Sequence, residues 1–146
     1  MRNPSEAIDH IEDFLRAYVK KAAAQGVVVG MSGGLDSSVA AALCGRAFDD
    51  SRKVLGLCMP EEETCNRENM RDAEDVAKNF NVEFRVVDVT PMIKAFAGNL
   101  EAFDPKNKVA IGNLKARVRA VTLYYYSNTM KRLVVGTTDK SEMMLG

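Results

Sequence analysis

The chain has 146 residues, of which 47% are hydrophobic and 27% charged, the composition of a globular protein with an apolar core. Lys and Arg together number 20, as do Asp and Glu, so charge favours neither a nucleic acid nor a membrane surface as partner. No apolar run approaches the length of a membrane span and no signal-peptide pattern is present, so we expect a cytoplasmic protein with one domain over residues 1–146.

The first predicted helix begins at Asn3, a capping residue followed by Pro4 at the first helical position, and it ends at Gly26. Residues at three-and-four spacing give it one apolar face: Ile8, Ile11, Leu15, Tyr18 and Ala22. Three valines, 27–29, predict a short buried strand. A glycine-rich turn then leads to a helix that begins near Asp36 and whose apolar positions are Val39, Ala40, Leu43 and Ala47.

The rest of the chain alternates between strand and helix patterns. The predicted strands are Lys53–Cys58, Glu83–Val87 and Leu133–Val135. The predicted helices are one with Met70, Ala73, Ala77 and Phe80 on a face, one from Thr90 to Gly98, and one from Lys108 to Thr129 with Ile111, Leu114, Val118, Val121 and Tyr125 in register. Residues 99–108 form an exposed connection between the last two. This alternation predicts an α/β fold, a parallel sheet with right-handed crossovers and helices on both faces.

Three cysteines and one histidine limit the metal chemistry that the sequence can support. Cys44, Cys58 and Cys65 are odd in number and lack CxxC spacing, which favours reduced thiols over a disulfide framework or a zinc site. The single His10 excludes a site made of several histidines.

Residues 30–37 read GMSGGLDS and carry the strongest functional signal. A strand, a glycine loop and a helix N-terminus together bind phosphate, because backbone N–H groups and the helix dipole face the anion. The loop is not a Walker loop, since Leu35 and Asp36 stand where a lysine is needed, and its glycines do not fit GxGxxG. Serine hydroxyls suit pyrophosphate oxygens, and the Asp36 carboxylate can ligate Mg²⁺. The alternative is a simple turn in which Asp36 caps the helix.

In such sheets ligands bind beyond the carboxyl ends of the strands, where the strand order reverses. The loops after the first, second and fourth strands, residues 30–37, 59–66 and 136–142, are expected at that edge.

The segment SGGLDS, residues 32–37, resembles the SGGxDS signature of the ATP pyrophosphatase (PP-loop) superfamily, whose members cleave ATP between the α and β phosphates. The resemblance implies a Rossmann-like sheet of the adenine nucleotide α-hydrolase type. It also implies an ATP site made by Gly30, Met31, Ser32, Gly33, Gly34, Leu35, Asp36 and Ser37.

Residues 112–119 (GNLKARVR), 123–126 (LYYY), 133–137 (LVVGT) and 140–142 (KSE) resemble the ammonia-dependent NAD synthetase family, as does the Met59-Pro60 pair. That resemblance implies that Thr137 contacts ATP, that Arg117 binds deamido-NAD, and that Asp36 and Glu142 hold Mg²⁺. The reaction would amidate deamido-NAD with ammonia through an adenylated intermediate, giving NAD, AMP and pyrophosphate. Ser32, Asp36 and Ser37 would position the reactants, with no side chain acting as acid or base.

The resemblance further implies a homodimer formed by the long helix, to which the tyrosines at 124–126 would contribute. Family members continue beyond the position that corresponds to Gly146, with further ATP and substrate contacts. We therefore expect a chain that lacks the C-terminal portion, which makes an ATP- and pyrophosphate-binding fragment with impaired ligation the alternative to a working synthetase.

Two other functions stay open on sequence grounds. A tRNA-modifying PP-loop enzyme is disfavoured because this chain has neither a catalytic cysteine pair nor an appended basic region. A non-catalytic nucleotide-binding module of the universal-stress type is disfavoured because simple nucleotide binding does not need the two carboxylates, Asp36 and Glu142.

Overall fold

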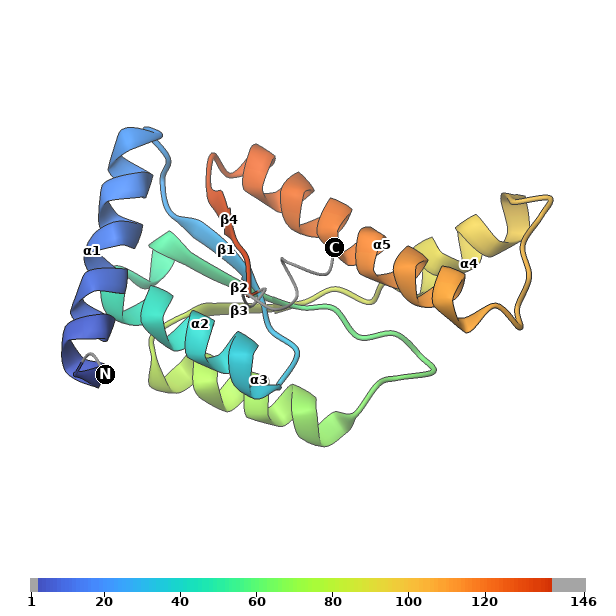
Figure 1. The fold of residues 1–146 in the computed structure, drawn as a ribbon, viewed down its shortest axis with the longest axis horizontal. Coiled ribbons are helices and arrows are strands. Elements are labelled where there is room, and N and C mark those ends of the chain that lie inside the picture. Colours follow the sequence, from blue (N-terminus) through green and yellow to red (C-terminus); the bar gives the residue numbers. More distant parts are fainter. Residues whose placement is uncertain (1–2, 138–146) are drawn as a thin grey trace.

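The computed structural model describes residues 3–137, which form a parallel sheet between two layers of helices (Figure 1). The strands are β1 (Val27–Gly30), β2 (Val54–Cys58), β3 (Glu83–Val86) and β4 (Leu133–Val135), in the spatial order β3-β2-β1-β4. The chain runs outward from β1 to β3 and then returns to place β4 on the other side of β1. This reversal of strand order marks the ligand-binding edge of an open α/β sheet.

Helices cover both faces of the sheet, which confirms the predicted fold class (Figure 1). One face carries α1 (Pro4–Lys21), α2 (Leu35–Ala47) and α3 (Arg67–Asn79), and the other carries α4 (Thr90–Asn99) and α5 (Lys108–Thr129). A 3-10 turn over Ser51–Lys53 precedes β2, so this strand begins one residue later than predicted. The connection between α4 and α5, with the helix ends that flank it, extends away from the sheet.

The core has two halves, one on each face of the sheet. Val27 and Val29 face the half formed with α1, α2 and α3, whereas Val28 joins Leu55 and Leu57 in the half under α4 and α5. Because β1 is buried on both faces, its sequence reads as an unbroken apolar run rather than an alternating one. Within residues 3–137, no helix combines the length and apolar character needed to cross a membrane.

The buried face of α1 is shifted by about one residue from the predicted one. The helix buries Glu12, Leu15 and Val19, while Ile11 and Tyr18 are exposed. Glu12 can be buried because Arg46 of α2 donates a hydrogen bond to it from Nε at 2.6 Å. A prediction based on hydrophobicity places every glutamate on the solvent side, so it cannot find a buried carboxylate that is paired.

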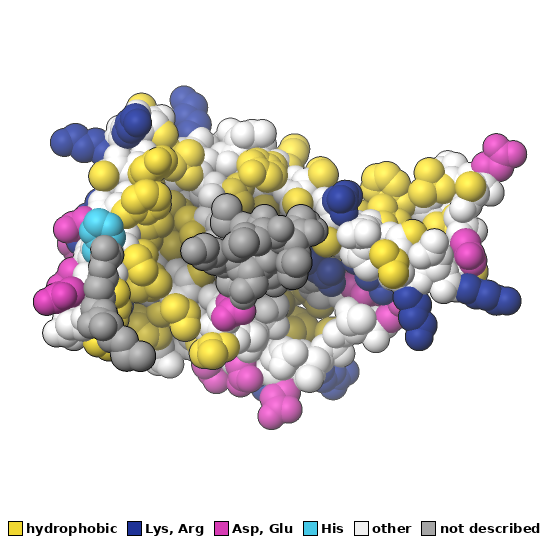
Figure 2. Space-filling model, viewed as in Figure 1, with side chains coloured by type: hydrophobic (Ala, Val, Ile, Leu, Met, Phe, Trp, Pro, Cys, Tyr) yellow, Lys and Arg dark blue, Asp and Glu magenta, His cyan; other side chains and the backbone are white. Residues whose placement is uncertain are grey.

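The faces of α2 and α5 are also partly corrected. In α2 the buried residues are Ser37, Ala41, Cys44 and Ala47, and Val39 is exposed. In α5 the buried face includes Thr122, whose hydroxyl donates to the Val118 carbonyl at 2.9 Å, a bond that satisfies a polar group inside the core. Val121 and Tyr125, predicted in register with the core, are 69% and 67% exposed. Figure 2 shows apolar side chains gathered beside α1 and along α5 and α4.

Candidate functional site

The turn between β1 and α2 begins at Met31, which anchors it to the sheet. The Met31 N–H donates to the Leu57 carbonyl at 2.9 Å, and its buried side chain lies over Gly56 of β2. A Cβ at Gly56 would overlap the Met31 sulfur. Both the N–H group and the side chain of Met31 are therefore directed into the protein.

Gly33 is required in this turn for two reasons. Its φ of +82° lies in the region that residues with a Cβ rarely adopt. An added Cβ would also overlap the carbonyl of Asn69, in the first turn of α3, and would lie 2.7 Å from the Asn69 Cα. The turn thus packs directly on α3, which fixes its position at the edge of the sheet.

The hydroxyls of Ser32 and Ser37 hold the turn in a curled conformation. Their oxygens lie 3.0 Å apart, the Ser32 N–H donates to Ser37 Oγ at 3.2 Å, and the Gly34 N–H donates to Ser32 Oγ at 3.2 Å. Helix α2 follows at once, and the N–H groups of its first turn have no intrahelical acceptor. The curled turn therefore presents these donors, and the positive end of the α2 dipole, to the edge of the sheet.

Asp36 lies in the first turn of α2, and its side chain is exposed. The residue at the N-cap is Gly34, and no side chain makes a cap hydrogen bond there. The alternative in which Asp36 caps the helix is therefore wrong. Asp36 forms no ion pair with any residue in 3–137, so its carboxylate is available to a cation beside the turn.

A pocket of about 460 Å³ opens at this edge of the sheet. Its walls come from the glycine turn, the end of β2 with the loop that follows, the start of α3, one face of α5 and the second residue after β4. The lining residues are Gly30, Met31, Ser32, Ser37, Leu57, Cys58, Met59, Pro60, Glu61, Thr64, Cys65, Asn66, Asn69, Met70, Arg119, Leu123 and Thr137. The predicted meeting of the loops after β1, β2 and β4 is thus observed.

The structure brings some predicted site residues together and leaves others apart. Ser32, Ser37 and Thr137 all line the pocket. Arg117 does not; it is exposed on α5, where its Nη1 donates to Asn113 Oδ1 at 3.3 Å. Glu142 lies outside the described residues.

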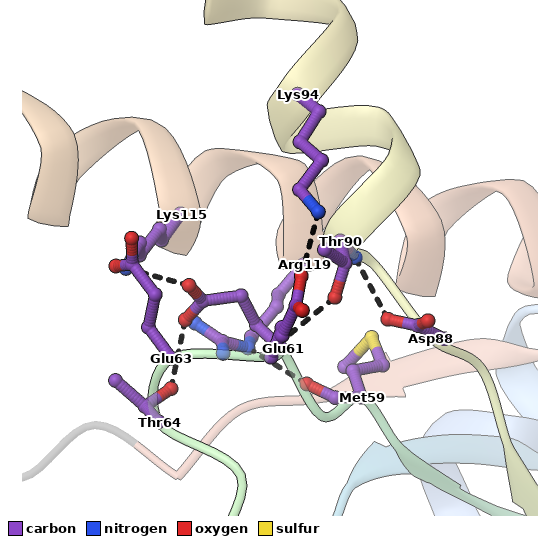
Figure 3. A network of polar contacts seen from close by, with 10 residues as sticks. Met59, Glu61, Glu63, Thr64, Asp88, Thr90, Lys94, Lys115 and Arg119 are labelled. Atoms are coloured by element: carbon purple, nitrogen blue, oxygen red, sulfur yellow. Dashed lines mark hydrogen bonds and ion pairs between the residues drawn. The ribbon is translucent and has the colours of Figure 1, made fainter.

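Arg119 is a pocket residue that the sequence analysis did not select. Its Nε donates to the Met59 carbonyl at 3.1 Å, which ties α5 to the end of β2 and holds the guanidinium at the pocket wall (Figure 3). Residues two apart on a helix point in different directions, so only one of Arg117 and Arg119 can face the sheet. The ARVR sequence alone does not indicate which one does.

Glu61 is a second such residue, a buried carboxylate at the pocket wall (Figure 3). It is 3% exposed, and its two oxygens accept hydrogen bonds from Lys115 Nζ and Thr64 Oγ1, both at 2.8 Å. Burial alone would raise the pKa of Glu61, but the bonds from Lys115 and Thr64 outweigh it and hold the pKa below its ordinary value. Lys115 also pairs with Glu63 at 2.8 Å, so two ion pairs link α5 to the loop.

The same loop is tied to α4 (Figure 3). Lys94 pairs with Glu62 at 2.6 Å, and the Glu62 N–H donates to Thr90 Oγ1 at 3.0 Å. The Thr90 N–H in turn donates to Asp88 Oδ1 at 2.9 Å. The loop after β2, which the sequence predicts at the ligand-binding edge, therefore forms a wall of the pocket and is held there by α4 and α5.

Comparison with known proteins identifies relatives over nearly the whole chain. A sequence model of the family described as NAD synthase matches residues 7–146. The NH(3)-dependent NAD(+) synthetase of Pyrobaculum aerophilum is 48% identical over 93% of this chain and 50% of its own length. That of Methanocaldococcus jannaschii is 46% identical over 97% of this chain and 54% of its own length. The chain thus spans about half the length of these curated relatives.

Solved structures agree with the sequence relatives. The NH3-dependent NAD synthetase of Campylobacter jejuni, in complex with the nitrate ion, superposes with a TM-score of 0.87 at 36% identity, over 97% of this chain and 59% of its own. The NMN synthetase of Francisella tularensis gives a TM-score of 0.87 at 29% identity, over 97% and 57%.

Proposed function

This chain belongs to the NAD synthase family, and on that premise we propose that it forms the ATP-binding part of an ammonia-dependent NAD synthetase. One observation carries the proposal beyond family membership. The first turn of α2 presents backbone donors at one edge of the sheet, beside the hydroxyls of Ser32 and Ser37 and the Asp36 carboxylate, which pairs with no cation among residues 3–137. This is the arrangement that a pyrophosphate with a divalent cation requires.

In the proposed complex the phosphates of ATP lie against the first turn of α2, where Ser32 and Ser37 supply further donors. Arg119 and Thr137 line the same pocket and would contact the nucleotide from α5 and from the end of β4. Asp36, together with Glu142, would hold Mg²⁺, which neutralises phosphate charge when bound. The exposed Asp36, which forms no ion pair with any residue in 3–137, fits this role. No group of three or more His, Cys, Asp or Glu side chains within 3–137 forms a metal site alone, so phosphate oxygens and water would complete the shell.

The proposed reaction has two steps. The nicotinate carboxylate of deamido-NAD attacks the α-phosphorus of ATP, and the bond to the β-phosphate oxygen breaks as pyrophosphate leaves. Ammonia then adds to the acyl carbon of the adenylate, AMP departs with the electron pair, and the nitrogen releases a proton to water. The residues of the turn position the phosphates and stabilise the charge that develops on the leaving pyrophosphate, without acid or base catalysis.

The exposed face of α5 supports the proposed homodimer. Arg117, Val121 and Tyr124 follow one another at intervals of four and three on this helix, and Val121 and Tyr124 are exposed apolar side chains. A dimer through this face would bury them and bring Arg117 to the interface, where it could bind a deamido-NAD molecule shared between subunits. Tyr124→Ser should shift sedimentation toward the monomer, whereas Tyr126→Ser, in the core beside Val118, should lower stability instead.

Because the chain spans about half the length of its relatives, we propose that by itself it binds ATP and pyrophosphate and ligates weakly. The test is calorimetric titration of Mg·ATP and of Mg·pyrophosphate, followed by assay of NAD, AMP and pyrophosphate with deamido-NAD and ammonium. Binding without full turnover is expected. Full turnover by the chain alone would contradict weak ligation, and the absence of nucleotide binding by folded protein would contradict the proposed function.

A matched pair of serine variants locates the nucleotide. Ser32→Ala removes a hydroxyl that lines the pocket, and a hydrogen bond to a charged group contributes about 1.5–3 kcal/mol. ATP affinity should fall about 10- to 100-fold. Ser38→Ala is the control, because Ser38 Oγ donates to the Gly34 carbonyl at 2.8 Å and does not line the pocket. Equal affinities for the two variants would place the phosphates elsewhere.

A further inference from the structure

Sulfur-bearing side chains are concentrated around the pocket. Five of its lining residues carry sulfur: Met31, Cys58, Met59, Cys65 and Met70. No step of the proposed reaction uses any of them. The third cysteine, Cys44, lies apart from them in the core between α2 and the sheet.

Three of these residues line the pocket on the α3 side of the sheet. Cys58 ends β2, and since Gly56 lies under Met31 on the α3 side, the two-residue period of the strand places Cys58 on that side too. Cys65 lies in the loop just before α3, and Met70 lies in the first turns of that helix. The Cys65 thiol contacts the Met70 sulfur at 3.5 Å, so the end of β2 and the start of α3 present two thiols and a thioether to one pocket.

We propose that Cys58, Cys65 and Met70 form a binding site for a soft monovalent metal ion, Cu(I). Thiolate and thioether ligands select Cu(I), whereas Mg²⁺ and Ca²⁺ require oxygen ligands. Within residues 3–137, no third His, Cys, Asp or Glu joins the two cysteines in a metal-holding group, so the set lacks the four nitrogen or thiolate ligands of a structural zinc site. Three sulfur atoms suffice for Cu(I).

The charge of Arg119 suits the proposed complex. Two thiolates and one Cu(I) ion give a net charge of −1, and the Arg119 guanidinium, which lines the same pocket, stabilises that charge. Because the cysteines bind as thiolates, metal binding releases protons. Because Cys65 is exposed, the metal ion would enter the site from solvent beside this residue.

The test is an anaerobic titration of the reduced protein with Cu(I) in competition with a coloured bidentate Cu(I) chelator, without nucleotide. Wild type should withdraw one Cu(I) from the chelator. Cys58→Ser, Cys65→Ser and Met70→Leu should each weaken binding by more than about tenfold, since even outer-shell partners of a metal contribute about 10- to 100-fold. Cys65→Ser and Met70→Leu change residues outside the buried core, so they remain informative if Cys58→Ser does not fold.

Matched controls make the result specific. Cys44→Ala removes a buried thiol that does not line the pocket, and Met92→Leu removes a thioether from α4. Both variants should bind Cu(I) as wild type does. The proposal is overturned if the three ligand variants keep wild-type affinity, or if Cys44→Ala weakens binding as much as they do. Metal binding is independent of the proposed synthetase function; only the further expectation, that bound Cu(I) weakens ATP binding in the shared pocket, rests on it.

Discussion

Replacing Gly33 by alanine would test whether the glycine turn is held against α3 as the structure shows. The backbone at Gly33 has a φ of +82°, and a left-handed conformation costs a residue with a Cβ about 1–2 kcal/mol. The added Cβ would lie 2.7 Å from both the Cα and the carbonyl carbon of Asn69, closer than real Cβ atoms come. Overpacking of this kind costs about 1–3 kcal/mol. The expected loss in the free energy of unfolding is therefore about 2–5 kcal/mol.

Urea denaturation followed by circular dichroism would measure this loss. With a slope of about 2 kcal/mol per molar urea, the unfolding midpoint of Gly33→Ala should fall by about 1–2.5 M. Gly112→Ala is the control, because the Cβ added there, in α5, meets nothing within 4 Å. Alanine is favoured over glycine inside a helix by about 0.5–1 kcal/mol, so this midpoint should rise slightly. A Gly33→Ala protein with the wild-type midpoint and ATP affinity would show that the turn is not held against α3 in this way.

Two further predictions concern charge and thiol chemistry. Lys115→Met leaves the carboxylate of Glu61 buried without its cation and should lower the free energy of unfolding by about 3 kcal/mol. Lys94→Met removes an exposed ion pair and should lower it by less than about 1 kcal/mol. Since the folded pKa of Glu61 is depressed, its ion pair stabilises the fold above the unfolded pKa and is lost as pH falls through the folded pKa. The difference in free energy of unfolding between wild type and Lys115→Met should thus be largest at neutral pH and should vanish in acid. Urea denaturation at several pH values measures it, and a difference that does not change with pH would contradict this prediction. Iodoacetamide at pH 8 should label Cys65 first and leave Cys44 unlabelled, because burial raises the pKa of the Cys44 thiol to about 12; rapid native labelling of Cys44 by mass spectrometry would contradict the packing of α2.

The parts of the fold that the sequence predicts well are those determined by neighbouring residues. The strand at 27–29, the glycine turn and the start of α2 follow from local preferences, and the structure places them within a residue or two of their predicted bounds. The parallel sheet follows from the alternation of strands and helices. The meeting of three loops at one edge then follows from the topology.

What the sequence could not predict depends on contacts between distant segments. Glu12 is buried because Arg46, 34 positions further along the chain, donates a hydrogen bond to it, and a hydrophobicity pattern contains no information about that partner. Glu61 is buried because of Lys115, which lies 54 positions further along the chain. The choice between Arg117 and Arg119 as the pocket residue depends on the rotation of α5 against the sheet, which is set by packing.

In the proposed function the glycine turn with Asp36 binds the phosphates of ATP together with Mg²⁺. This is tested by calorimetric titration of ATP into wild type and Asp36→Asn, each with Mg²⁺ and with chelator, with Asp75→Asn as a control on the exposed side of α3. Wild type and Asp75→Asn should bind ATP at least about tenfold more tightly with Mg²⁺, and Asp36→Asn should lose this dependence. ATP binding that is equally tight with and without Mg²⁺, or unchanged by Asp36→Asn, would contradict it.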